Sequence, residues 1–156
     1  YELDNMPIID VYEKYFGKAI AKKLPKIGIE IPLMIDKAGT LVARACINKF
    51  EDGALLFAGN LKEGEIVRFG IGSVERILKE STNLYNEIQT TLTPQSLFVY
   101  SCMARKRLLN TEISLELNGF SEICSVSGFF GNGEFFSNKE QAYLMNETMT
   151  ILALSE

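Results

Sequence analysis

The sequence contains no histidine, and this absence excludes more chemistry than any other feature of its composition. Without an imidazole, this chain cannot form a Ser–His–Asp or Cys–His catalytic group, a zinc site with histidine ligands, or a haem site with a histidine axial ligand. We expect no cofactor and no metal ion, and the lack of a histidine base argues against an enzyme that uses Cys102 as its nucleophile.

Two further absences concern the partners of the protein. No apolar run approaches the roughly 20 residues that are needed to span a bilayer. The formal net charge is −4, whereas a nucleic-acid interface needs a basic face. We expect neither a membrane nor a nucleic acid among the partners.

Cysteine is scarce, and its spacing fits no disulfide framework. Cys46, Cys102 and Cys124 are odd in number and form no CxxC motif. This usage is typical of reduced thiols, and so it predicts a cytoplasmic protein.

The composition that remains is that of a globular protein. Of 156 residues, 47% are hydrophobic and 23% charged, which is enough for one core, so residues 1–156 are expected to form a single domain. The sequence begins at Tyr1 without a methionine, and we expect it to be a segment of a longer polypeptide.

The hydrophobic pattern divides into two parts. A helix over 8–15, ended by Gly17, and a short helix over 18–24 precede four short apolar or alternating runs. Turn signals separate these runs, so they predict an antiparallel meander. The runs cover residues 31–35, 41–50, 54–58 and 65–69.

The second part alternates helices and strands. Ser73 is expected to cap a long helix whose apolar stripe runs from Val74 to Ile88. A strand over 96–101, a helix that stops at Asn118–Gly119, and a strand over 123–129 then predict a parallel βαβ crossover. The fold class is α+β, with a mixed β-sheet, an antiparallel N-terminal meander, one crossover and helices packed on the sheet.

The end of the chain holds a glycine-rich stretch and a last strand. Residues 128–136, GFFGNGEFF, match no phosphate-binding loop, and Asn132–Gly133 is typical of a tight turn between two paired strands. Residues 137–146 are expected to be a loop or a short helix, and residues 148–154 a strand.

The stretch from Ser96 to Leu109 is the first candidate site. Its apolar run, residues 97–100, predicts a strand buried on both faces, and the residues after Cys102 favour a helix that Ser101 would cap. Ligands are usually held where such a strand ends. The alternative is an ordinary strand–helix junction.

Residues from separate places along the chain resemble the C-terminal half of the FIST sensory domain, a bacterial intracellular signal-transduction module. The stretch FVYSCMARKRLL carries the Ser-Cys-x-x-Arg pattern of that family, here as Ser101, Cys102 and Arg105. The other matching stretches are VYEKYFG at 11–17, LVARA at 41–45, GNLKEGEIVRF at 59–69, VSGFFGNGEF at 126–135 and NETMTILAL at 146–154.

The resemblance implies a ligand-sensing domain that passes a conformational signal to an output domain such as a histidine kinase, a diguanylate cyclase or a chemoreceptor. Small ligands such as amino acids have been proposed for the family, so an amino-acid-like ligand is expected. The N-terminal half of the FIST domain is expected as a partner. The alternative function is a protein-interaction scaffold without a working ligand site.

The family-matched positions suggest how an amino acid would be held. Arg44 and Arg105 would bind its carboxylate by paired hydrogen bonds, and Glu134 its ammonium group. Arg44 is equally explained by an ion pair at the edge of the core, Arg105 by a solvated charge run, and Glu134 by a solvent-facing turn.

The remaining candidates are Cys102, Gly128 and Phe129, with Ser101 as a neutral hydrogen-bonding group. Cys102 lies near the start of a helix and near Arg105, a setting that lowers a thiol pKa, although a packed inert thiol is the alternative. Gly128 is a further ligand-binding candidate, and Phe129 or Phe135 would supply an apolar wall of the pocket.

Overall fold

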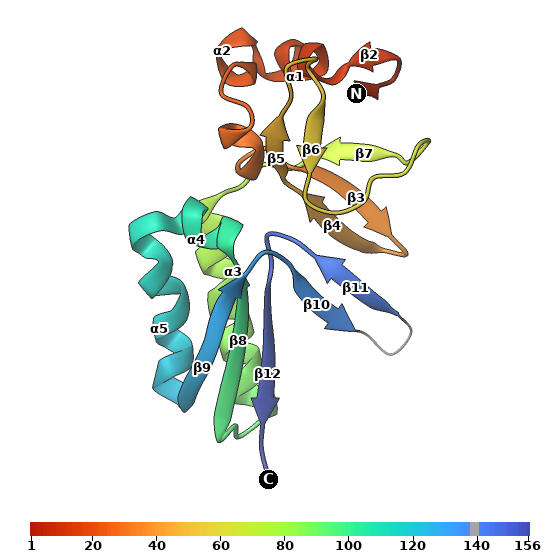
Figure 1. Ribbon diagram of the computed structural model, residues 1–156. Coiled ribbons are helices and arrows are strands. Elements are labelled where there is room, and N and C mark those ends of the chain that lie inside the picture. The colour runs from red at the N-terminus through yellow and green to blue at the C-terminus, as the bar shows by residue number, and fades with distance from the viewer. Residues whose placement is uncertain (138–140) are drawn as a thin grey trace. The chain divides into compact units, whose positions relative to one another are not determined.

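The computed structural model describes residues 1–137 and 141–156 and contains two compact units, Tyr1–Ile71 and Gly72–Glu156 (Figure 1). Each unit has its own helices and small β-sheets, which confirms the α+β class. Within residues 1–137 and 141–156 the strands form five small sheets, and the meander and the crossover do not share one mixed sheet there. The single-domain organisation of residues 1–156 stays a prediction.

The first unit begins with helices and continues as antiparallel strands. Two short strands and α1 open it, and α1 ends at Gly17 as expected. The predicted run 41–50 is interrupted at Ala45, so it forms two strands that belong to different sheets. The elements are β1 (Glu2–Leu3), β2 (Met6–Pro7), α1 (Ile8–Phe16), α2 (Lys18–Ala21), η1 (Lys26–Ile29), β3 (Leu33–Lys37), β4 (Thr40–Arg44), β5 (Cys46–Lys49), β6 (Leu55–Phe57) and β7 (Val67–Phe69).

The core of the first unit lies between α1 and one face of the antiparallel sheet β4-β3-β7. Tyr12 is fully buried there, its hydroxyl donates to the Ile31 carbonyl at 3.0 Å, and its ring meets Phe69 edge-on at 5.0 Å. Leu33 and Ile35 point into the unit from β3, while Met34 and Asp36 alternate to the opposite face.

The second unit holds the longest helix and the predicted crossover. Ser73 caps α3, and its side chain accepts a hydrogen bond from the Arg76 amide. The elements are α3 (Val74–Thr91), β8 (Ser96–Cys102), α4 (Met103–Leu109), η2 (Asn110–Glu112), α5 (Ile113–Ile123), β9 (Ser125–Gly131), β10 (Glu134–Ser137), β11 (Ala142–Met145) and β12 (Met149–Leu154).

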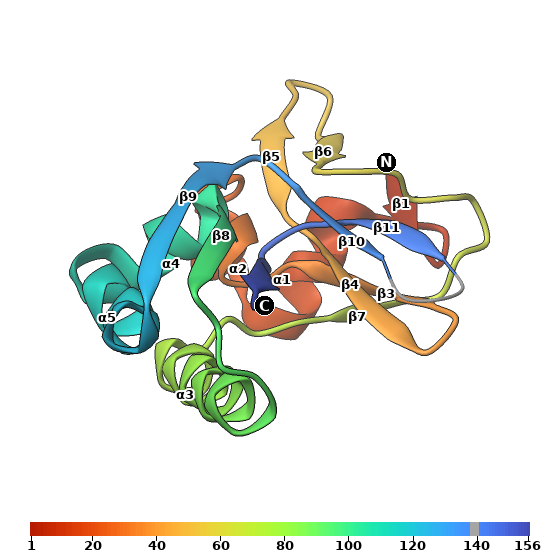
Figure 2. The same ribbon diagram turned by 90° about the horizontal axis from the view of Figure 1, so that it is seen from below.

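Strand β8 is the centre of the sheet β12-β8-β9. It pairs with β9 in parallel, with Tyr100 opposite Phe129, and with β12 in antiparallel (Figure 1). The parallel pairing of residues 96–101 with the strand that follows the helices confirms the crossover prediction. Leu97 and Val99 are buried on one face, together with Ile88 of α3 and Phe120 of α5. Figure 2 shows both helices on this side of the sheet.

The predicted stop at Asn118–Gly119 is wrong, because α5 continues to Ile123. A Cβ atom at Gly119 would lie 3.2 Å from the ring of Tyr85 on α3. The glycine therefore permits the close packing of the two helices instead of ending one. The break comes earlier, at Asn110, whose φ is 48°.

The predicted hairpin around Asn132–Gly133 is also wrong. These residues separate β9 from β10, but β9 pairs with β8, and β10 pairs in antiparallel with β11. Part of the segment 137–146, expected to be a loop or a helix, is the strand β11, and its residues 138–140 lie outside the described residues. The last strand is confirmed as β12.

The helices of the described residues, 1–137 and 141–156, include none with the length and apolar character required to cross a bilayer.

Candidate functional site

The candidate site is the end of β8, where the chain passes directly into α4. The cap residue of α4 is Cys102, whose side chain makes no capping hydrogen bond, and Ser101 is still part of the strand. The expectation that Ser101 caps this helix is therefore wrong. Its hydroxyl is buried, and its oxygen has no hydrogen-bond partner among the described residues.

Arg105 of α4 connects three helices of the second unit. Its Nη2 atom forms an ion pair with Oε1 of Glu116 on α5 and lies 3.4 Å from Oγ of Ser81 on α3. The Ser81 hydroxyl contacts the same Glu116 oxygen at 3.1 Å. Glu116 is only 2% exposed, so the carboxylate that holds Arg105 is one that the fold has removed from water.

Glu134, at the start of β10, is buried against the turn that precedes β12. Its Oε2 atom accepts hydrogen bonds from the Thr148 hydroxyl at 2.8 Å and from the Thr148 amide at 3.3 Å. The Thr148 carbonyl in turn accepts from the Cys102 amide at 2.9 Å. Burial raises the pKa of the Glu134 carboxyl, while the hydrogen bonds from Thr148 act in the opposite direction. The interpretation of Glu134 as a solvent-facing turn residue is wrong.

Glu147 is the last member of a cluster around the end of β8, and no sequence pattern points to it. The cluster consists of Ser81, Ser101, Cys102, Arg105, Glu116, Glu134 and Glu147. The Glu147 backbone has a φ of 59°, in the left-handed region where side chains other than glycine are uncommon. Burial raises the pKa of its carboxyl to about 8, the positive charge of Arg105 lowers it, and the negative charge of Glu134 raises it further. Glu147 therefore lies within electrostatic reach of both side chains.

The same cluster keeps several buried polar atoms without a hydrogen-bond partner among the described residues. Buried polar groups are nearly always paired, because an unpaired one costs about 1–3 kcal/mol. All the unpaired side-chain atoms of this kind that the described residues hold are in the second unit. They are Ser101 Oγ, Arg105 Nε, Glu116 Oε2, Glu134 Oε1 and Glu147 Oε1.

The Cys102 thiol lies inside this cluster. Burial raises its pKa above the ordinary value, the backbone amides of Ala104 and Glu147 lower it, and the nearby Glu134 carboxyl raises it. The interpretation of Cys102 as a low-pKa thiol therefore does not hold. The alternative, a packed thiol, is the one that its burial supports.

Arg44 belongs to the first unit and binds the loop between β6 and β7. Its Nη1 atom donates to the Ala43 carbonyl at 2.9 Å, and its Nε atom to the Asn60 carbonyl at 3.4 Å. Burial lowers its pKa, and the charge of Glu65 raises it. A joint site of Arg44 with Arg105 and Glu134 stays a prediction.

Gly128 and Phe129 have structural explanations in β9. A Cβ atom at Gly128 would lie 1.8 Å from the Val99 carbonyl oxygen, so only glycine permits this approach of β9 to β8. Phe129 is 65% exposed and packs edge-on against Tyr100 at 5.2 Å. It lies on the open face of the sheet, so the expected apolar wall of a buried pocket is not formed by this ring.

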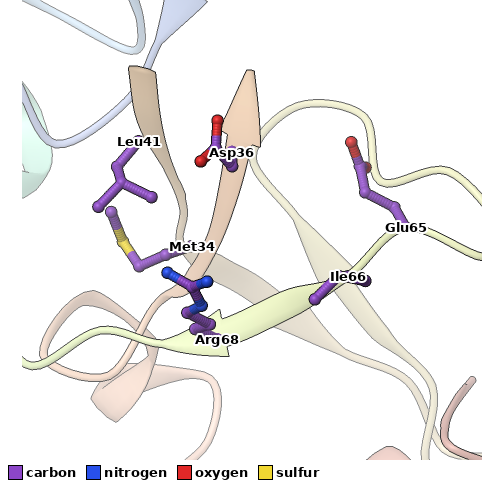
Figure 3. Close-up of a pocket in the computed structure, with 6 residues that line it drawn as sticks. All are labelled: Met34, Asp36, Leu41, Glu65, Ile66 and Arg68. Carbon is purple, nitrogen blue, oxygen red and sulfur yellow. The ribbon is translucent and has the colours of Figure 1, made fainter. Parts of the chain in front are cut away.

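A shallow cavity of about 300 Å³ lies elsewhere, on the outward face of the sheet in the first unit. Figure 3 shows Met34, Leu41 and Arg68 together on this face, with Ile66 and Glu65 on the segment that leads into β7. Glu65 is already paired with Lys37. None of the residues predicted from the sequence lines this cavity, so it is not the predicted site.

Three members of the cluster, Ser81, Glu116 and Glu147, were not predicted as site residues. Two of them are visible in the sequence as polar residues on the apolar face of a helix. Glu116 lies three residues after Ile113 and four before Phe120, so it is an acid on the apolar face of its helix. Ser81 interrupts the apolar stripe of α3 in the same way. Glu147 has no such pattern, because it lies in a turn between two strands.

The comparisons with known proteins agree with the resemblance noted in the sequence. The family model of the FIST C domain matches residues 9–137, most of the chain and parts of both units. No curated protein and no solved structure is significantly similar to the chain.

Proposed function

Because this chain belongs to the FIST C domain family, whose model covers residues 9–137, we propose that it is a ligand-sensing module of a cytoplasmic bacterial signal-transduction protein. In this proposal it binds a small, amino-acid-like molecule and passes a conformational signal to an output domain. A histidine kinase, a diguanylate cyclase or a chemoreceptor is the kind of output domain that fits, and the N-terminal half of the FIST domain is a further partner.

The observation that carries the proposal is the set of unpaired polar atoms around the end of β8. A fold that leaves Glu134 Oε1 and Arg105 Nε buried without partners gains free energy when a ligand supplies the missing hydrogen bonds. The cluster includes all three residues of the family-matched pattern, Ser101, Cys102 and Arg105. It also involves α3, α4 and α5, so a ligand that changes it has helices through which to act.

The proposal is that of a receptor and not of an enzyme. The buried thiol of Cys102 has a raised pKa, and no histidine exists to act as its base. A test is the reaction of the native chain with a thiol-specific reagent, in which Cys102 should react far more slowly than the partly exposed Cys124. Rapid modification of Cys102 would contradict a purely structural role.

A second function, a protein-interaction scaffold, has one observation in its favour. The face of the sheet opposite α3 and α5 carries exposed apolar side chains, among them Phe129 at 65%, Leu152 at 50% and Leu154 at 48%. Exposed apolar patches of this kind often mark protein contacts.

A thermal-shift screen against the common amino acids separates the two functions. A ligand that binds only the folded state stabilises it by about 2.7 kcal/mol at a concentration one hundred times its dissociation constant, so a sensor should show a raised melting temperature. Replacing Glu134 by Gln should abolish that rise. A screen in which no amino acid raises the melting temperature would favour the scaffold.

A further inference from the structure

Among its unpaired atoms, the cluster at the end of β8 has more carboxyl oxygens than hydrogen-bond donors. Three carboxylates, those of Glu116, Glu134 and Glu147, each keep one oxygen without a partner, against one arginine nitrogen and one hydroxyl. A ligand that completes this set must itself be rich in donors. An ammonium group has three and carries a positive charge, which suits the surplus of acids.

Glu134 and Glu147 are the two carboxyls that remain for such a group. The Glu116 carboxylate is already paired with Arg105 and contacts Ser81. By contrast, Glu134 is bonded through Oε2 to Thr148 and lies within hydrogen-bonding reach of the Cys102 thiol, and its Oε1 has no partner among the described residues although only 2% of the residue's surface is exposed. Glu147 is less buried than Glu134, and its Oε1 also has no partner among the described residues.

The backbone also supports Glu147 as a binding residue. A non-glycine residue in the left-handed region stores strain that a fold usually retains where geometry matters for function. Glu147 directly precedes Thr148, the residue that Glu134 binds, and its carboxyl lies within electrostatic reach of Arg105 and Glu134.

Resting on the function proposed above, we propose that Glu134 and Glu147 form a subsite for the amino group of the ligand. One ammonium group would donate to the free oxygen of each carboxyl, and Arg105 would stay bound to Glu116. A metal ion is the poorer occupant, because residues 1–137 and 141–156 hold no group of three or more His, Cys, Asp or Glu side chains suited to one.

Binding at this subsite should be coupled to the release of a proton. The charged groups within electrostatic reach of the Glu147 carboxyl are Arg105 of α4 and Glu134 of β10, and the Cys102 thiol contacts the backbone amide of Glu147. Since the Glu147 carboxyl keeps its proton up to about pH 8, an ammonium group must displace that proton to the solvent when it binds. Affinity for a cationic amine should therefore rise as the pH increases toward that value.

The experiment is an NMR titration of the isotope-labelled chain with three probes of matched size: n-butylammonium, butyrate and 2-aminobutyrate. The first and third should shift the amide signals of Glu134, Glu147 and Thr148, and butyrate should not. Butylammonium should bind several-fold more tightly at about pH 8.5 than at about pH 6.5. Glu134→Gln and Glu147→Gln should each weaken it roughly tenfold or more, while the control Glu122→Gln, at an exposed position of α5, should not.

The outcomes separate this subsite from the function on which it rests. If 2-aminobutyrate shifts signals elsewhere in the chain, the sensor stands and the subsite is wrong. If butylammonium binds at the two glutamates while no amino acid binds anywhere, the subsite stands and the amino-acid class is wrong. The subsite is also refuted if butyrate alone shifts these signals, or if Glu122→Gln weakens butylammonium as much as the other two variants.

Discussion

Each unit holds one family-matched arginine, and the two differ in their surroundings. In the first unit, Arg44 is buried and donates to the backbone carbonyls of Ala43 and Asn60, and the charge of Glu65 raises its pKa. In the second unit, Arg105 is paired with the buried carboxylate of Glu116, and two further carboxyls lie within electrostatic reach. The first arginine joins a loop to a strand, whereas the second lies in a cluster of charges.

This difference shows where a ligand would change the energy of the protein. The backbone carbonyls of Ala43 and Asn60 accept hydrogen bonds from Arg44, and this contact holds a loop on a strand. The cluster around Arg105 still lacks hydrogen bonds, because Arg105 Nε, Glu134 Oε1 and Glu147 Oε1 are buried without partners among the described residues. A group with matching donors and acceptors has more to gain there.

The largest expected effect comes from removing each arginine in turn. Arg105→Ala should destabilise the fold by about 3–5 kcal/mol, because Glu116 is left as an unpaired buried charge. Arg44→Ala should cost less, about 1–3 kcal/mol, because the hydrogen bonds that it loses to Ala43 and Asn60 are to neutral carbonyls. Urea denaturation measures both, with the exposed Arg107→Ala as the control. Equal losses for Arg44→Ala and Arg105→Ala would remove the distinction between the two units.

The next effect is on the pH dependence of stability. The Glu147 carboxyl has a pKa of about 8 in the folded chain against 4.5 as its ordinary value. Between these values the folded state binds more protons than the unfolded state, so the free energy of unfolding should fall as the pH rises through this window. The loss should be on the order of 2–4 kcal/mol. Urea denaturation across this pH range measures the slope of the free energy of unfolding against pH. Most of this slope should disappear in Glu147→Gln, and the control Glu122→Gln should retain it. An unchanged slope in Glu147→Gln would contradict the burial of this acid.

A smaller effect tests the contact of Arg44 in the first unit. Gly59 has a φ of 92°, and a Cβ atom there would lie 2.8 Å from Nε of Arg44. Gly59→Ala should therefore cost about 1–3 kcal/mol. The matched control is Gly53→Ala, which has a φ of 86° but no atom within 4 Å of the added Cβ, so it measures the backbone strain alone. Equal costs for the two variants would mean that the loop does not press on Arg44.

The last prediction is that haem does not bind to the chain. Haemin added to the purified chain should give no stoichiometric Soret band, because no histidine is present to bind the iron. Cysteine or tyrosine ligation is the chemical alternative. A saturable band at one haem per chain would contradict the prediction and would add a site to one of the two units.

The elements that could be predicted were those defined by local pattern. The stripe of α3 and the cap at Ser73 depend on residues a few positions apart, and both were found. The parallel pairing of β8 with β9 also followed, since it depends on the order of elements and the usual handedness of crossovers.

The predictions that were wrong concern residues whose role is decided by a distant partner. Gly119 has the appearance of a helix stop, but it is needed for the approach of Tyr85. Asn132–Gly133 has the composition of a hairpin turn, yet β8 is the strand that pairs with β9.

The candidate site was located from the sequence, but its charges were only partly identified. Arg105 and Glu134 were selected from the resemblance, and the structure places both in one electrostatic cluster. Glu116 and Glu147 reach that cluster from another helix and another turn, and no local spacing connects them to it.

The central claim is that the ligand binds to the cluster of the second unit and not to the cavity in Figure 3. Its most direct test is isothermal titration of the intact chain with the amino acid that gives the largest thermal shift, comparing the wild type with Glu134→Gln and with Arg68→Ala. We predict that Glu134→Gln lowers the affinity roughly tenfold or more, because it replaces a buried carboxylate that would face the ammonium group. We predict no change in affinity for Arg68→Ala, which alters the cavity in Figure 3. An affinity that falls in Arg68→Ala and is retained in Glu134→Gln would contradict the account.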